Sequence, residues 1–123
     1  LVRKICSKCI ESYQADRKEL EEKFSPNFVG RFFAAQSGKN KLRLYRGKGC
    51  KLCSFTGYLG RIGIFEVLEM SEPIRSLIMK RSSADEIKTQ AIKEGMTEMI
   101  DDGVTKVLAS VTTIDEILRV TRE

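Results

Sequence analysis

The sequence predicts an α+β fold, with a small cysteine-stapled lobe of short strands and helices followed by a small all-helical lobe. Three observations support this prediction. The only four cysteines of the 123-residue chain lie in its first half, in two C-x-x-C pairs. Alternating and β-branched apolar residues flank the second pair, and helix-start signals follow it. We place the boundary between the lobes so that they span residues 1–69 and 70–123.

The four cysteines form a metal-site pattern. Each C-x-x-C pair can direct two thiolates toward one point through a tight turn, and two such turns complete the tetrahedral sulfur shell that Zn²⁺ accepts. The predicted metal ligands are Cys6, Cys9, Cys50 and Cys53. Because a closed four-sulfur shell leaves no ligand position for water, we expect Zn²⁺ to be structural and its binding to contribute to folding.

Other interpretations of the same cysteines stay open. An even number of cysteines permits disulfides, although adjacent C-x-x-C pairs in a chain without a signal-peptide pattern fit a reducing compartment better. One C-x-x-C on a βαβ frame would indicate a thioredoxin-like redox site, but this chain has two matched pairs. Iron is the other candidate metal, since all-sulfur tetrahedral sites accept either zinc or iron.

Between the cysteine pairs, the sequence predicts a helix, a helical apolar cluster and a strand. Residues 15–24 are rich in helix formers, with Asp16 placed to cap their start. Four apolar residues are spaced for one face of a short helix and are expected in the core: Phe28, Val29, Phe32 and Phe33. After a turn at residues 37–40, Leu42 and Leu44 alternate with polar neighbours in a short strand.

Glycines interrupt the segment that follows the second cysteine pair, at Gly57, Gly60 and Gly63. The same segment becomes apolar and β-branched over residues 62–68. We therefore expect one or two short strands in this segment, with the glycines permitting tight turns or a close backbone approach to the metal lobe.

Helix signals dominate the last part of the chain. Ser71, followed by Glu and Pro, marks one helix start, and S/T-x-x-E capping boxes begin at Ser83 and Thr113. Apolar residues at helical spacing predict another helix over residues 96–108, although Gly103 weakens its middle.

The positive charges of the chain are concentrated in one stretch. Residues 24–65 contain eight Lys and Arg and no carboxylate, whereas residues 66–123 contain twelve carboxylates and eight Lys and Arg. Lys8, Lys48 and Lys51 flank the cysteine pairs and can offset the negative charge of Zn²⁺ bound by four thiolates. The remaining basic residues could attract an acidic partner, nucleic acid or an anionic membrane surface, or simply be solvated.

The composition argues against a catalytic role for this segment. There is no histidine, and every cysteine belongs to a pair, so the common general bases and thiol nucleophiles are absent. The Gly38-Lys39 dipeptide is not a P-loop, because Phe33 stands where the first glycine is required and Asn40 where Ser or Thr is required. Asp101 and Asp102 are helix neighbours that point apart, so we expect both to be solvent-exposed.

No apolar run approaches the roughly 20 residues of a membrane-spanning helix, and no N-terminal signal pattern is present. These observations predict a cytoplasmic protein. The chain begins with Leu1 and not with methionine, which is expected of a segment of a longer protein.

Three segments carry a resemblance to a known family: LVRKICSKC at residues 1–9, LYRGKGCKLCSFTGYLGRIGIFEVLEM at 44–70 and TTIDEILRVTRE at 112–123. They resemble the C-terminal portion of the ATPases that power type II secretion and type IV pilus assembly, the GspE/PilB group. The resemblance covers residues 1–9 and 44–123. Its most specific element is the order of two cysteine pairs, spaced glycines and the Phe-Glu pair at 65–66.

The resemblance implies an ATPase parent whose four cysteines bind zinc in a subdomain beside the ATPase core. It also implies a homo-hexamer at the cytoplasmic face of the inner membrane, without direct membrane insertion, that acts on inner-membrane platform proteins to assemble pilin-like subunits. ATP and Mg²⁺ would bind only upstream of this segment. Arg43, Arg46 and Arg61 could then contact a neighbouring subunit or an acidic partner.

Two competing functions come from other classes. A zinc-ribbon module that binds nucleic acid would explain the basic stretch, with Phe28, Phe32, Phe33 and Tyr45 stacking on bases. A peptide-binding surface like that of chaperone zinc domains would use the C-x-x-C-x-x-x-G segment from Cys50 to Gly57, of which only one half is present.

Overall fold

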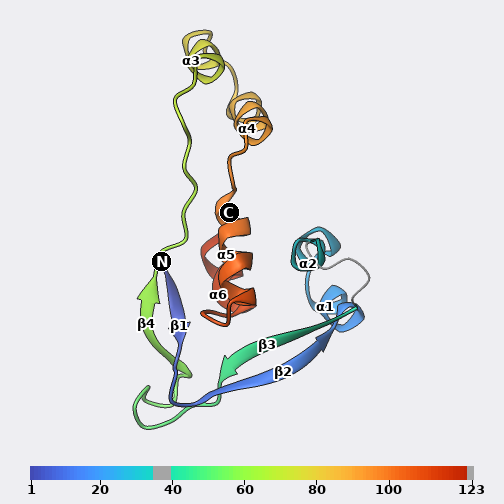
Figure 1. Ribbon diagram of the computed structural model, residues 1–123, viewed down its shortest axis with the longest axis vertical. Helices are drawn as coiled ribbons and strands as arrows, with labels where there is room; N and C mark the ends of the chain where they lie inside the picture. Colours follow the sequence, from blue (N-terminus) through green and yellow to red (C-terminus); the bar gives the residue numbers. More distant parts are fainter. Residues whose placement is uncertain (35–39, 122–123) are drawn as a thin grey trace.

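The computed structural model describes residues 1–34 and 40–121. Within these residues the chain forms four strands and six helices, which confirms the α+β class (Figure 1). In chain order they are β1 (Val2–Ile5), β2 (Ile10–Asp16), α1 (Arg17–Lys23), α2 (Pro26–Phe33), β3 (Lys41–Gly47), β4 (Tyr58–Ile62), α3 (Glu72–Met79), α4 (Ala84–Lys93), α5 (Met99–Leu108) and α6 (Ile114–Thr121). The predicted turn at residues 37–40 falls almost entirely outside the described residues.

The strands form two antiparallel two-stranded sheets, with the β2–β3 pair nested between β1 and β4 in chain order. β1 pairs with β4, with Val2 opposite Ile62, and β2 pairs with β3, with Ala15 opposite Leu42. The chain therefore passes between the two sheets twice: from β1 to β2, and back again from β3 to β4. Each of these two connections carries one C-x-x-C pair.

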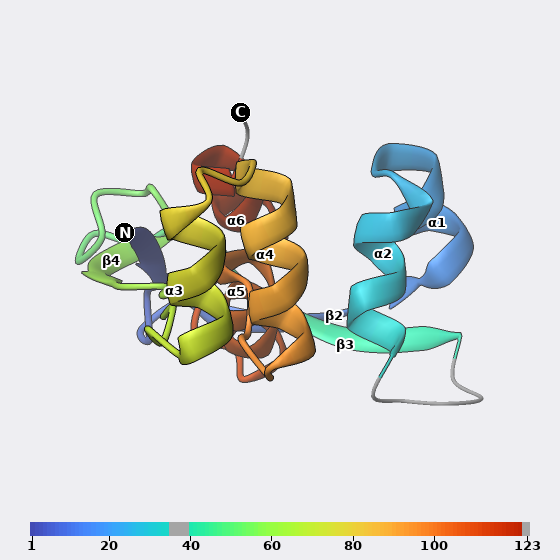
Figure 2. The ribbon, with the colours of Figure 1, turned by 90° about the horizontal axis from the view of Figure 1, so that it is seen from above.

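One apolar core lies between the strands and the helices. The Phe28, Val29, Phe32 and Phe33 side chains of α2 are buried, as the sequence predicted, and so are Leu42 and Leu44 of β3. Side chains from α5 and α6 belong to the same core, among them Val104, Val107, Ile114 and Ile117. Figure 2 shows α1 and α2 on one side and the other four helices on the other, with β2 and β3 spanning between them.

The expected helix at residues 15–24 is shorter than predicted, because a strand occupies its start. β2 continues to Asp16, and Ala15 is buried opposite Leu42 of β3. Helix α1 begins only at Arg17. Asp16 stands at the N-cap position but makes no capping hydrogen bond, and its carboxylate lies 4.0 Å from the Lys41 ammonium. Pairing with β3 overrides the helix propensity of these residues.

One of the one or two short strands expected after the second cysteine pair is present as β4, but it lies before most of the β-branched stretch. β4 ends at Ile62, and residues 63–70 form no regular element. Ile64 is buried, whereas Phe65 and Val67 are 66% and 71% exposed. The β-branched composition favours an extended backbone, but no other described strand pairs with this segment.

The predicted helix starts after Ser71, Ser83 and Thr113 are confirmed. Each of these side-chain oxygens accepts a hydrogen bond from the amide three residues later, at 3.2–3.3 Å. Helix α5 begins at Met99, three residues later than expected. Gly103 does not interrupt α5. The missing side chain instead lets α6 approach closely, since an added Cβ atom would lie 2.7 Å from the Ile117 Cδ1 atom.

The packing of the helices divides them into two groups. Helices α3 and α4 contact each other at one end of the molecule, whereas α5 and α6 pack together and against α2, β3 and β1 (Figure 1). The boundary between residues 1–69 and 70–123 stays a prediction. No helix in the described part of the chain is both long and apolar enough to cross a membrane.

A buried carboxylate ties β1 to α6. Glu116 is 1% exposed, and its carboxylate accepts hydrogen bonds from the Arg3 backbone amide at 2.7 Å and the Arg3 guanidinium at 3.0 Å. Arg119, one turn along α6, donates to the same carboxylate at 2.9 Å. Burial raises the pKa of Glu116, but hydrogen bonds from Arg119 and Arg3 reverse this effect and lower the pKa from 4.5 to about 2.

We expect the Glu116→Gln variant to be about 2 kcal/mol less stable at pH 7, because it leaves Arg3 and the buried amide with weaker acceptors. The wild-type pKa is lowered by folding, so the stabilisation is present above pH 4.5 and is lost as the pH falls toward 2. Urea unfolding across this pH range measures both effects.

Glu11→Gln is the matched control, since Glu11 pairs with Arg46 at 3.0 Å on an exposed surface. We expect it to change the free energy of unfolding by less than about 0.5 kcal/mol. An equal acid-induced loss of stability in wild type and Glu116→Gln would contradict the role assigned to Glu116.

Candidate metal centre

The structure brings the four predicted ligands together. Cys6 and Cys9 lie in the connection between β1 and β2, and Cys50 and Cys53 lie between β3 and β4. All four Sγ atoms lie within 4.8 Å of one another, so the group could hold a metal ion such as zinc. Cys6 and Cys53 are buried, and the other two are partly exposed.

The spacing of the sulfur atoms fits a tetrahedral metal site. The Sγ atoms of Cys6 and Cys50 are 3.8 Å apart, as are those of Cys9 and Cys53, and those of Cys50 and Cys53 are 3.7 Å apart. Four sulfurs at about 2.3 Å from a tetrahedral Zn²⁺ would be separated by about 3.8 Å. A disulfide would require about 2.05 Å, so the disulfide alternative does not describe this structure, in which all four cysteines are free.

Backbone amides point at two of the sulfurs. The Gly49 amide donates to Cys9 Sγ at 3.2 Å, and the Cys50 and Gly57 amides donate to Cys53 Sγ at 3.3 Å. Hydrogen bonds of this kind stabilise a thiolate over a thiol. The turns that position the cysteines therefore also favour the charge state that a metal requires.

The electrostatics of the cluster are uneven. Burial alone would raise the pKa of Cys53, but the Cys50 and Gly57 amides and the neighbouring thiols lower it to about 6. Burial raises the pKa of Cys9 to about 12, with the nearby thiols adding to the effect and the Gly49 amide opposing it. The protein groups thus favour one thiolate at Cys53, and a cation is needed to stabilise further negative charge beside it.

Glycine is required where the two connections meet. The Cys6 amide donates to the Gly57 carbonyl at 2.9 Å, and the Lys48 amide donates to the Cys9 carbonyl at 2.9 Å. The Gly57 backbone has a φ of 83°, and a Cβ atom there would lie 2.6 Å from the Gly47 carbonyl oxygen. The sequence predicted that the glycines would permit tight turns or a close backbone approach, but the pairing of Gly57 with Gly47 and the amide donors to sulfur depend on the fold.

The basic residues around the cluster differ in their partners. Lys8, Lys48 and Lys51 are exposed and form no ion pair with another described residue. Arg46 pairs with Glu11 and lies over the Tyr13 ring, 4.7 Å from its centre.

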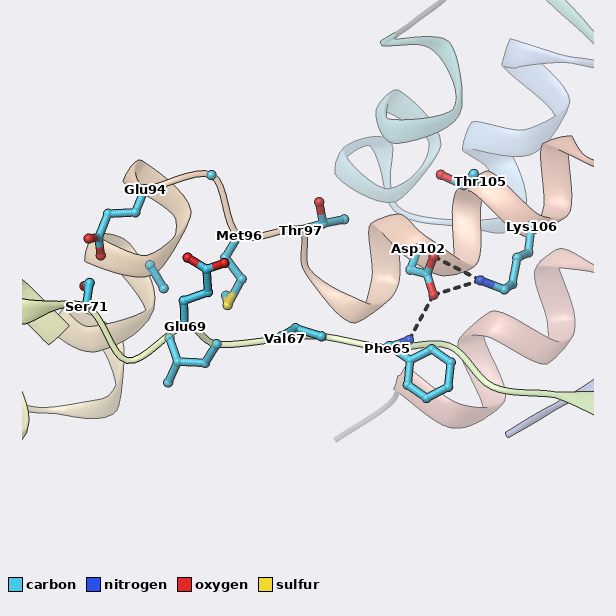
Figure 3. Close-up of a pocket in the computed structure, with 13 residues that line it drawn as sticks. Phe65, Val67, Glu69, Ser71, Glu94, Met96, Thr97, Asp102, Thr105 and Lys106 are labelled. Carbon is cyan, nitrogen blue, oxygen red and sulfur yellow. Dashed lines mark hydrogen bonds and ion pairs between the residues drawn. The ribbon is translucent and has the colours of Figure 1, made fainter. Parts of the chain in front are cut away.

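A second candidate site is the open groove of about 620 Å³ between residues 65–71, the end of α4 and the middle of α5. Figure 3 shows the Asp102 carboxylate at this groove, between the Phe65 amide and the Lys106 ammonium, which donate to it at 2.9 Å. The Lys106 hydrogen bond lowers the pKa of Asp102. Asp102 and Lys106 are thus paired with each other, whereas the Glu69 and Glu94 carboxylates that also line the groove have no ion-pair partner among the described residues.

The expectation that Asp101 and Asp102 are solvent-exposed is wrong. Both are partly buried, and the Asp101 carboxylate pairs with Arg31 of α2. Asp102 pairs with Lys106, four residues later on the same helix, a spacing that the sequence already shows. The partner of Asp101, Arg31, comes from another helix and could not be read from local spacing.

Comparisons with known proteins identify relatives. The family described as "Type II/IV secretion system protein" matches residues 1–119. The "Type IV pilus assembly ATPase PilB" of Thermus thermophilus is 37% identical over 123 residues, which are all of this chain and 13% of that protein. The "Type II secretion system protein E" of Pseudomonas aeruginosa is 41% identical over 123 residues, all of this chain and 22% of that protein. The chain thus spans less than a quarter of either relative.

We expect Gly57→Ala to lower the metal content and to destabilise the chain by about 2 kcal/mol or more, because alanine is strained at this φ and its Cβ meets the Gly47 carbonyl. Elemental analysis after gel filtration and thermal unfolding measure the two effects.

Gly30→Ala is the matched control in helix α2, where a Cβ atom would meet nothing within 4 Å. This substitution should keep the metal and leave stability unchanged or raised by up to about 1 kcal/mol. Full metal occupancy and wild-type stability in Gly57→Ala would show that the contact between the glycines does not matter.

Proposed function

Because this chain belongs to the type II/IV secretion system protein family, we propose that it is the C-terminal accessory region of a larger motor ATPase. The observation that carries the proposal is the four-cysteine cluster in a chain that matches named ATPases over its whole length. Since the chain spans only 13% of the Thermus thermophilus relative and 22% of the Pseudomonas aeruginosa relative, most of the motor would lie outside it.

We propose that Cys6, Cys9, Cys50 and Cys53 hold a structural Zn²⁺. Zinc, when bound, supplies charge neutralisation and a closed tetrahedral link, and it leaves no position for a reacting water. The chain's own groups supply the rest: two tight turns aim the sulfurs, and the Gly49, Cys50 and Gly57 amides stabilise thiolate charge. The site would thus be a rigid element and not a catalyst.

ATP hydrolysis would take place in the part of the longer protein that this chain does not include, where ATP and Mg²⁺ bind. The best-buried acidic groups of α5 and its N-cap serve ion pairs; Glu98, for example, accepts from Lys88 at 3.0 Å and from Arg31 at 3.2 Å. The Lys88 hydrogen bond lowers the pKa of Glu98, which makes that carboxylate a weak proton acceptor. An acid or base for chemistry would instead need a pKa near neutral pH.

The exposed segment 65–70 is proposed to pack against the remainder of the longer protein. Phe65, Val67, Leu68 and Met70 are large apolar side chains left in solvent along one extended stretch. Apolar runs of this kind usually mark a contact surface. We accordingly treat residues 1–69 as the metal-binding lobe and 70–123 as the helical lobe of the accessory region.

In the complete protein we infer a homo-hexamer at the cytoplasmic face of the inner membrane, where it drives pilin or pseudopilin assembly. The metal-binding lobe would transmit movement of the ring to inner-membrane platform proteins. Arg43 and Arg61 are exposed and suited to contacts with a neighbouring subunit or an acidic partner, whereas Arg46 is already paired with Glu11.

The nucleic-acid alternative loses its main support in this structure. Phe28, Phe32 and Phe33 are at most 5% exposed and pack in the core, so they cannot stack on bases. Of the aromatic residues that this alternative invoked, only Tyr45 is partly exposed.

We expect Cys50→Ser, introduced into the complete natural protein, to abolish zinc retention and secretion or pilus output, because three sulfurs no longer close the shell. Zinc content, hexamer formation and output should be measured on the same variant. Ser7→Ala is the matched control, since Ser7 is exposed between two proposed ligands and should leave all three quantities unchanged. Normal output with an empty site would overturn the proposed role.

A further inference from the structure

The loop that carries the second cysteine pair exposes two large apolar side chains. Leu52 is 55% exposed and Phe55 is 70% exposed, close to Cys53, whose side chain is buried. The loop lies near the opposite end of the molecule from α3 and α4 (Figure 1). We call residues 51–56 the knuckle tip.

The backbone of the knuckle tip is fixed, so the exposure of Phe55 is built into the turn. The Phe55 amide donates to the Cys50 carbonyl at 2.8 Å, and the Thr56 hydroxyl donates to the Cys53 carbonyl at 2.7 Å. Ser54 and Phe55 both adopt positive φ angles, 54° and 62°, which are unfavourable for residues with a side chain. The turn that closes the second cysteine pair therefore holds the Phe55 side chain in solvent at a cost in backbone strain.

Lysines without an ion-pair partner lie near these apolar side chains in the sequence and in the other cysteine turn. Lys51 lies directly before Leu52, Lys48 precedes Cys50, and Lys8 lies in the other cysteine turn. All three lysines are exposed and have no ion-pair partner among the described residues. The nearest acidic residue of the adjoining strands, Glu11, is occupied by Arg46.

Exposed aromatic and aliphatic side chains flanked by free lysines fit the surface of an anionic bilayer. Phenylalanine and leucine can enter the boundary between headgroups and acyl chains while lysines stay at the phosphates. A protein partner fits less well, because a stable interface buries about 800 Å² on each side, far more than two side chains of one turn provide. The absence of carboxylates from residues 24–65 removes the charge that would repel such a surface.

We propose that the knuckle tip binds anionic phospholipid headgroups, with Phe55 and Leu52 in the interfacial layer and Lys8, Lys48 and Lys51 at the phosphates. The contact is peripheral and crosses no part of the bilayer. The lipid proposal depends on the proposed function only in assuming that the protein works at a membrane face. Vesicle binding can fail while zinc retention and motor output behave as proposed, so the two proposals are tested separately.

The chain contains no tryptophan, so one introduced indole reports its own surroundings. In the zinc-loaded chain, Phe55→Trp should shift its emission to shorter wavelength with equimolar phosphatidylglycerol and phosphatidylcholine vesicles, and brominated lipids should quench it. Phe65→Trp is the matched control, because Phe65 is 66% exposed but lies outside the knuckle tip. Its emission should not change. Leu52→Trp is a second probe if Phe55→Trp loses metal.

Charge variants test the lysines in the same assay. We expect Lys48→Gln and Lys51→Gln each to weaken vesicle binding about fivefold, and high salt to weaken wild-type binding. Lys80→Gln and Lys93→Gln, exposed at the ends of α3 and α4, should have no effect. Equal emission shifts at positions 55 and 65, no preference for anionic vesicles, or the same shift with polyglutamate or single-stranded DNA would each overturn the lipid assignment.

Discussion

The four-sulfur cluster stands where the chain passes between its two sheets, and the strand region depends on it. Each sheet has only two strands, and an isolated two-stranded sheet is marginally stable in water. β1 must also find β4 across a long intervening segment, at a cost in loop-closure entropy. The cysteine pairs lie at both crossings, so one metal ion bound there would fix both sheets and offset much of that cost.

The helices are connected to this point through β1. The Glu116 carboxylate of α6 holds the Arg3 amide and guanidinium, the Thr112 hydroxyl donates to the Arg3 carbonyl at 2.8 Å, and the Ile5 amide donates to the Val111 carbonyl at 2.9 Å. Helices α5 and α6 thus pack in one core with β1, the strand that leads directly into the first cysteine pair. Helices α3 and α4 contact mainly each other, and extended segments join them to the rest.

Features encoded by neighbouring residues could be predicted from the sequence. The two C-x-x-C motifs predicted that the four cysteines come together, and the serine and threonine caps predicted three helix starts, because each of these signals spans only a few positions. Features set by distant partners could not be predicted. Residues 10–16 form a strand because β3 pairs with them, and Glu116, which resembled a capping-box residue, is used instead to hold Arg3. Residues 63–70 have strand-like composition, but the described residues contain no strand to pair with them.

A metal at the cluster is proposed to hold the two sheets together, and amide hydrogen exchange tests this role most directly. The Cys6 amide, bonded to the Gly57 carbonyl, and the Lys48 amide, bonded to the Cys9 carbonyl, link the two cysteine turns. In the zinc-loaded chain both amides should exchange slowly, together with those of β1 paired to β4. Chelation should abolish this protection, and added zinc should restore it. Equal protection of these amides with and without metal would contradict the account.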